Sequence, residues 1–251
     1  MLRGSSLIIS FLLLVGRLSI FAQQDPNVQV GSVKLYRIGE LLRMHNVELT
    51  EPALLRALKN SDAEVRALAA EKLAEDKTRD AIPAIEEALA AEKMPRSRVN
   101  IALALAQLAD QTGLTELRRL CADSDFVPEF RLYAATYMFD LHSQTDECLG
   151  AVEEIVRSKT VSFGDRISAL SLLPRFHDLA PEESQRLFQL VVDRLDDPEP
   201  TVRMGASAAL VSLGNAAAIP FLKTAIAREK EEGIRNVFER DLGKLQGHPT
   251  E

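Results

Sequence analysis

Apolar residues recur along the chain at fixed distances from six arginines. The arginines are 32 to 37 residues apart: Arg66, Arg98, Arg131, Arg166, Arg203 and Arg235. Seven residues after them stand large apolar residues: Leu73, Leu105, Met138, Leu173, Leu210 and Leu242. Three residues after them stand Ala69, Ile101, Ala134, Ala169, Ala206 and Phe238. Offsets of three and seven lie on one face of a helix, so the pattern predicts an amphipathic helix at each arginine.

A second apolar segment follows each of the first five helices. These segments begin near Ile82, Leu114, Leu149, Pro181 and Ile219. Three carry a proline at the start, where a first helical turn tolerates the missing N–H. Each unit is therefore predicted to be a helix, a turn and a helix. Such a unit is too small to bury its own apolar faces and does so by stacking on its neighbours.

The units resemble HEAT repeats, in the short form found in phycobilin lyase subunits. The segments that carry the resemblance are "SDAEVRALAAEKL", "DDPEPTVRMGASAAL" and the two Ala-Ile-Pro sequences. The resemblance covers residues 50–246 and implies an all-α fold, a right-handed α-solenoid of about six HEAT-like repeats. It also implies a concave face that grips partners. Residues 23–49 are predicted to be an N-terminal capping helix and linker, and residues 247–251 a C-terminal tail.

The first 22 residues have the layout of a secretory signal peptide. A positive start precedes the apolar run "LIISFLLLV", and cleavage is expected after Ala22. The alternative is an uncleaved membrane anchor, although the 16 residues Leu7–Ala22 contain Arg17 and fall short of the roughly 20 residues a spanning helix needs. We expect an exported protein, periplasmic or secreted, with membrane contact only if this segment is retained.

The charge of the chain disfavours nucleic acid as a partner. Residues 1–22 contain two of the 30 basic residues and none of the 37 acidic ones, so the mature chain has a net charge of 28 − 37 = −9. A chain this acidic repels a phosphate backbone. No nucleic-acid partner is therefore expected.

The two cysteines, Cys121 and Cys148, fall in the second helices of adjacent units. Cys121 is placed near the end of its helix and Cys148 near the start of the next one. If neighbouring second helices run parallel, the two thiols lie at opposite ends, too far apart for a disulfide. The sequence therefore predicts two buried free thiols.

The third unit breaks the pattern with an aromatic stripe. Tyr133 and Tyr137 stand two and six residues after Arg131, and Phe126 and Phe130 extend the stripe at spacings of four and three. One interpretation is a core stripe that fills a wider gap between helices. The other is a patch that anchors a partner, because rigid aromatic side chains are good interface anchors.

We interpret the repeated arginines and the two aligned histidines as structural residues and not as a ligand site. Acidic residues lie four or six positions before the arginines and are expected to pair with them and to cap the helices. His142 and His177 occupy equivalent turns, but two histidines without a close third ligand make a poor metal site. No metal and no cofactor are expected.

The sequence contains no G-x-S-x-G, H-E-x-x-H, C-x-x-C or glycine-rich phosphate motif. We therefore expect a non-enzymatic scaffold in the cell envelope that binds a protein or peptide on its concave face. The alternative is an accessory or lyase-like subunit of an enzyme complex, held at the membrane by an uncleaved N-terminus.

Overall fold

The computed structural model describes residues 37–143, 145–176 and 179–247, and within these ranges every regular element is a helix. The α-helices are α2 (Ile38–Met44), α3 (Glu51–Ala57), α4 (Ala63–Glu75), α5 (Ile82–Ala91), α6 (Pro95–Gln107), α7 (Gln111–Ala122), α8 (Pro128–Asp140), α9 (Leu149–Arg157), α10 (Phe163–Leu172), α11 (Pro181–Asp193), α12 (Pro200–Leu213), α13 (Ile219–Arg228) and α14 (Glu232–Leu245). Short 3-10 helices lead into or out of five of these: η1 (Arg79–Ala81), η2 (Asp146–Cys148), η3 (Leu173–Arg175), η4 (Arg194–Asp196) and η5 (Ala216–Ala218). The predicted all-α fold is confirmed.

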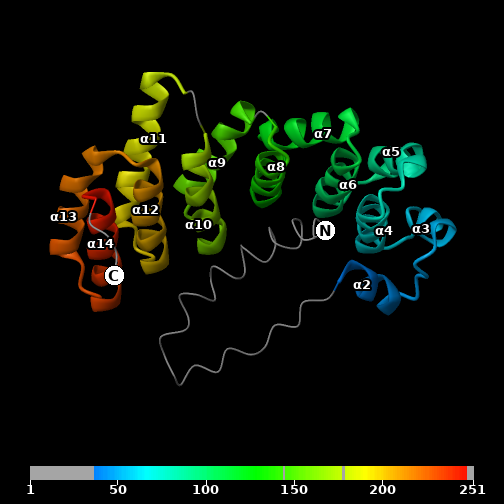
Figure 1. Ribbon diagram of the computed structural model, residues 1–251, viewed down its shortest axis with the longest axis horizontal. Coiled ribbons are helices and arrows are strands. Elements are labelled where there is room, and N and C mark those ends of the chain that lie inside the picture. The colour runs from blue at the N-terminus through cyan, green and yellow to red at the C-terminus, as the bar shows by residue number, and fades with distance from the viewer. Residues whose placement is uncertain (1–36, 144, 177–178, 248–251) are drawn as a thin grey trace.

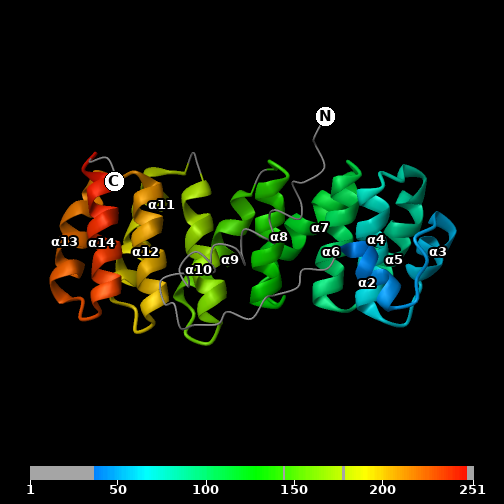
Figure 2. The same ribbon diagram turned by 60° about the horizontal axis from the view of Figure 1, so that its bottom comes forward.

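The helices form two layers that curve into an arch (Figure 1). We call the helices that carry the six arginines the A helices: α4, α6, α8, α10, α12 and α14. The B helices are those that follow them: α5, α7, α9, α11 and α13. Each A helix contacts the next, and the A helices line the inner side of the curve (Figures 1 and 2). The predicted α-solenoid is thus the observed architecture.

The buried faces of the A helices are the ones that the sequence pattern predicts. Every residue three positions after the six arginines is fully buried. So are the residues seven positions after the first five arginines, while Leu242 of the sixth is partly buried against the core. The small Ala69, Ala134, Ala169 and Ala206 leave room for the adjacent helix, which is why the layers pack closely.

The first and last predicted segments are only partly covered. The signal-peptide prediction for residues 1–22 lies outside the described residues, as does most of the tail 247–251. Helix α2 lies within the segment predicted to cap the array and contacts α4. In the described part of the chain, no helix combines the length and the hydropathy that a membrane span requires.

The turns after the A helices share a left-handed residue. Eleven positions after four of the arginines stand Lys77, Ala109, His142 and Gly214, with φ angles of 59°, 63°, 53° and 64°. A residue in this conformation ends a helix, and only glycine adopts it without steric cost. His142 is therefore an exposed turn residue, as the sequence suggested. His177, at the same offset from Arg166, lies outside the described residues.

The cysteines form a disulfide, so the prediction of two free thiols is wrong. Cys121 and Cys148 are bonded, with their Cα atoms 5.2 Å apart. The prediction assumed that α7 and α9 lie parallel and side by side. Instead, α7 packs against η2, the 3-10 turn that leads into α9, so that the end of one B helix meets the beginning of the next.

The acids between the repeats form an ion-pair ladder that differs from the predicted pairing. Glu92 precedes Arg98, yet its carboxylate binds Arg66 of the previous unit, while its backbone carbonyl accepts a hydrogen bond from Arg98 at 2.8 Å. Glu229 links Arg203 to Arg235 in the same way. Each acid therefore joins two consecutive repeats, and the arginines are structural.

Asp197 forms another link of the ladder, between Arg166 and Arg203. The third unit has no such link among the described residues. There Arg131 donates to the backbone carbonyl of Cys121 and pairs with Glu154. The ladder therefore covers both ends of the array and is interrupted around the third unit, next to the disulfide.

Candidate functional site

The predicted aromatic stripe lies on α8 and on the turn just before it, in the layer of A helices (Figure 1). Phe126, Phe130, Tyr133 and Tyr137 are all half-buried and pack against the core. The rings of Phe130 and Tyr133 meet edge to face, with centroids 5.7 Å apart. The structure thus brings the four predicted residues together. Their packing fits a core stripe, and the exposed part of their surface remains open to a partner.

Tyr137 is held by a chain of polar contacts that crosses three A helices. Its hydroxyl donates to the side-chain oxygen of Asn100 on α6, at 3.4 Å. Asn100 also lies close enough to Glu71 on α4 to influence the pKa of that carboxyl group. Polar side chains of α4, α6 and α8 therefore lie near one another.

Burial changes the proton affinity of these groups. It raises the pKa of Glu71 to about 7, against the opposing effects of the hydrogen bond from Asn100 and the charge of Arg96. Burial also raises the pKa of Tyr133 and of Tyr137 above the usual range. At neutral pH both tyrosines are therefore neutral hydrogen-bond donors, and Glu71 is close to half-protonated.

We call Glu71, Arg96, Asn100, Tyr133 and Tyr137 the inner-face cluster. Sequence analysis found only its two tyrosines. A signal for Asn100 was present, because it stands two residues after Arg98, as Tyr133 stands two residues after Arg131. The same offset holds small residues further along the array, Ser168 on α10 and Gly205 on α12. At this offset the A helices therefore carry a polar or aromatic residue on α6 and α8 and a small residue on α10 and α12.

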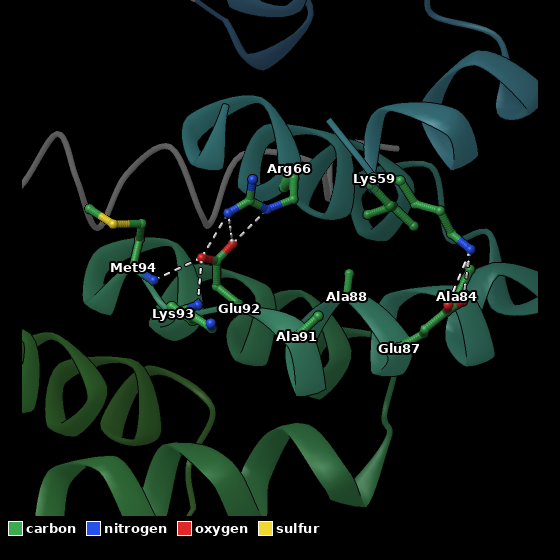
Figure 3. Close-up of a pocket in the computed structure, with 10 residues that line it drawn as sticks. Lys59, Arg66, Ala84, Glu87, Ala88, Ala91, Glu92, Lys93 and Met94 are labelled. Carbon is green, nitrogen blue, oxygen red and sulfur yellow. Dashed lines mark hydrogen bonds and ion pairs between the residues drawn. The ribbon is translucent and has the colours of Figure 1, made fainter. Parts of the chain in front are cut away.

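The outer layer carries two shallow grooves. The first, of about 370 Å³, lies along α5 and is walled by the ion pairs of Arg66 with Glu92 and Lys59 with Glu87 (Figure 3). The second, of about 460 Å³, lies one repeat further, where Arg98 pairs with Glu116. Because equivalent grooves recur at successive repeats with their charges already paired, they follow from the packing of the B helices.

Metal binding finds no support in the part of the chain that the structure describes. There, no group of three or more histidine, cysteine or acidic side chains is placed to hold an ion. The inner-face cluster offers hydrogen-bond donors, one cation and aromatic surface. Such a set recognises a polar and partly apolar surface on a partner.

Comparison with known proteins agrees with the helical repeat. Residues 51–137 match the family model of HEAT repeats. No curated protein matches the chain. A solved structure, the complex of CpcE and CpcF of phycocyanin lyase from Nostoc sp. PCC7120, is 20% identical, with a TM-score of 0.37 over 88% of this chain and 92% of that chain. The helix pairs described above agree with this match, which identifies residues 51–137 as HEAT repeats.

Proposed function

We propose that this chain is a non-enzymatic scaffold that binds a protein or peptide along the inner face of its arch. The HEAT repeats support an interaction role, because stacked helix pairs create an extended curved surface. The observation that carries the proposal is the inner-face cluster. There, the half-buried Tyr133 and the exposed Arg96 stand in the repeats before those that carry the small Ser168 and Gly205.

Tyr133 is the side chain that we assign to partner contact. The hydroxyl of Tyr137 is held by Asn100, whereas Tyr133 has no hydrogen-bonding partner among the described residues, which leaves its hydroxyl for a partner. Tyrosine is enriched at interface hot spots because one ring combines apolar area with a polar end. Arg96, exposed on α6, adds a cation beside it.

The test compares two substitutions at equivalent positions. Tyr133→Ala removes the proposed anchor, and Ser168→Ala alters the same offset of the A helix α10. Crosslinking and affinity capture from the envelope fraction should retain a specific protein on the wild type and on Ser168→Ala, and lose it on Tyr133→Ala with an unchanged melting temperature. Equal capture by all three proteins would contradict the proposal.

The cell envelope is part of the same proposal. The signal-like first 22 residues support it, and so does the Cys121–Cys148 disulfide, because disulfides persist in oxidising compartments. N-terminal sequencing of the mature protein, together with cell fractionation, tests it. A mature chain that begins at Met1 and fractionates with the cytosol would refute export.

A further inference from the structure

Exposed hydrophobic side chains gather at one edge of the array. Among the described residues, five large hydrophobic side chains are exposed, at Met44, Met94, Val127, Phe163 and Phe221. Met94, Val127 and Phe163 are 55%, 39% and 49% exposed, and each stands at the first turn of an A helix, α6, α8 or α10. Single exposed apolar residues are ordinary, but here Met94 and Val127 are the N-caps of α6 and α8 and Phe163 is the first residue of α10, so three consecutive A helices begin with an exposed apolar residue.

The repeat pattern shows that these positions need not be apolar. Met94 and Val127 stand four residues before their arginine, where the other repeats have Asp62, Ser162, Glu199 and Glu231. Asp62 caps α4 by accepting a hydrogen bond from the backbone N–H of Glu64, whereas Met94 and Val127 cap nothing. An acidic or amide cap stabilises a helix start by about 1 kcal/mol. Helices α6 and α8 therefore forgo this stabilisation and expose apolar surface instead, whereas α10 keeps its cap at Ser162 and exposes Phe163 beside it.

The starts of the three helices that carry these side chains form a row. Helix α6 contacts α8, and α8 contacts α10, so the first turns of these helices are neighbours along the edge where each B helix connects to the next A helix (Figure 2). Packed helices are about 10 Å apart, which sets the spacing between Met94, Val127 and Phe163. Phe126 and Phe130, both half-exposed at the start of α8, widen the row at its middle.

The middle of the row is acidic. Asp123, Asp125 and Glu129 flank Val127. Asp123 pairs with Arg119, while Asp125 and Glu129 form no ion pair with any residue that the structure describes. A partner that covers Val127 therefore meets uncompensated negative charge and is favoured if it brings basic side chains.

We propose that the row of Met94, Val127 and Phe163 is a docking surface for a basic amphipathic helix of a partner protein. A helix rises about 1.5 Å per residue, so apolar side chains seven residues apart are about 10.5 Å apart and match the repeat spacing. Lysines or arginines beside the central apolar residue meet Asp125 and Glu129. This surface adjoins the inner-face cluster, because the ring of Phe130 meets that of Tyr133, but Met94, Val127 and Phe163 are not part of that cluster, so the proposal goes beyond the proposed function.

The test removes the apolar row without changing the charge or weakening the helices. The variant combines Met94→Asn, Val127→Asn and Phe163→Gln, and asparagine is a better N-cap than methionine or valine. The probe is a fluorescein-labelled helical peptide of about 21 residues, with leucines at heptad positions and lysines elsewhere. A matched peptide carries glutamate in place of lysine. Met44→Asn is the control variant, because Met44 is exposed outside the row.

Fluorescence anisotropy should show the lysine peptide binding to the wild type and to Met44→Asn, and binding at least about tenfold more weakly to the triple variant. The glutamate peptide should not bind. Equal affinity of the lysine peptide for the wild type and the triple variant would overturn the proposal, and so would absence of binding to the wild type. Loss of binding in Tyr133→Ala but not in the triple variant would place the peptide on the inner face and leave the proposed function standing.

Two further measurements test whether a second copy of the chain or a lipid surface covers the row instead of a basic helix. Sedimentation velocity would overturn the proposal if the wild type formed a dimer that the triple variant did not, since a second copy would then cover the row. Co-flotation with phosphatidylglycerol vesicles would overturn it if the wild type, but not the triple variant, bound lipid while neither bound the peptide.

Discussion

The carboxylate of Glu92 accepts two hydrogen bonds from the guanidinium of Arg66, at 2.8 and 2.9 Å, across the boundary between two repeats. The Glu92 side chain is fully buried. Glu92→Gln should therefore lower the free energy of unfolding by about 2–3 kcal/mol, because it leaves a largely buried cation without its partner. Urea denaturation measures this. Glu87→Gln is the matched control on the same helix, since Glu87 pairs with Lys59 in an exposed position, and it should change stability by less than about 1 kcal/mol.

Glu71 should make the protein less stable as the pH rises toward neutrality. Its pKa is about 7 in the folded protein, above the value of an unfolded glutamate, so the folded state binds more protons between these two pKa values. The contribution of Glu71 to stability is then full below the unfolded pKa and falls by about 2–3 kcal/mol as the pH passes through the folded one. Glu71→Gln should remove this dependence, which denaturation at about pH 5 and about pH 8 would reveal. An unchanged difference between the two pH values would contradict the assignment.

Substitutions at two turn residues with a positive φ should change the free energy of unfolding in opposite directions. Ala109 has a φ of 63°, so Ala109→Gly should raise the free energy of unfolding by about 0.5–1 kcal/mol. Gly214 has a φ of 64° and free space around its Cα, so Gly214→Ala should lower it by about 1 kcal/mol through backbone strain alone. Differential scanning calorimetry measures both changes. Melting temperatures that move in the same direction would contradict the explanation.

The disulfide predicts a loss of stability on reduction. Cys121 and Cys148 are 27 residues apart, and the closure of a loop of this size contributes about 3–4 kcal/mol. The double variant Cys121→Ala, Cys148→Ala should lose this amount, and the wild type in reductant should melt like the variant. A thiol assay on the denatured, unreduced wild type should detect no free thiol. Two thiols would show that the bond does not form.

The fold could be predicted because the same spacing of apolar residues recurs in each repeat. Ala69 and Leu73 belong to a spacing that recurs six times, so the helices, their buried faces and their stacking all follow from the sequence. The cysteine pair could not be predicted in the same way. Whether Cys121 meets Cys148 depends on the angle between α7 and the start of α9, which no residue spacing encodes.

Only part of the candidate site was visible in the sequence. Tyr133 and Tyr137 stand out because they are rare residue types at a position where small residues dominate. Asn100 and Glu71 are common on helix surfaces, and their contact with Tyr137 depends on the lateral approach of three helices. The pKa of Glu71 likewise depends on burial by neighbouring repeats, which a linear pattern does not report.

The interruption of the ion-pair ladder has a mechanical consequence. At the two ends of the array, consecutive repeats are clamped by charge, through Glu92 on one side and Asp197 and Glu229 on the other. Between the second and third repeats the clamp is covalent. The stiffness of the arch therefore has two independent controls. Protonation of Glu92 or Glu229 would release charge clamps at the ends, while reduction would release only the covalent link in the middle, where α7 still packs against α8.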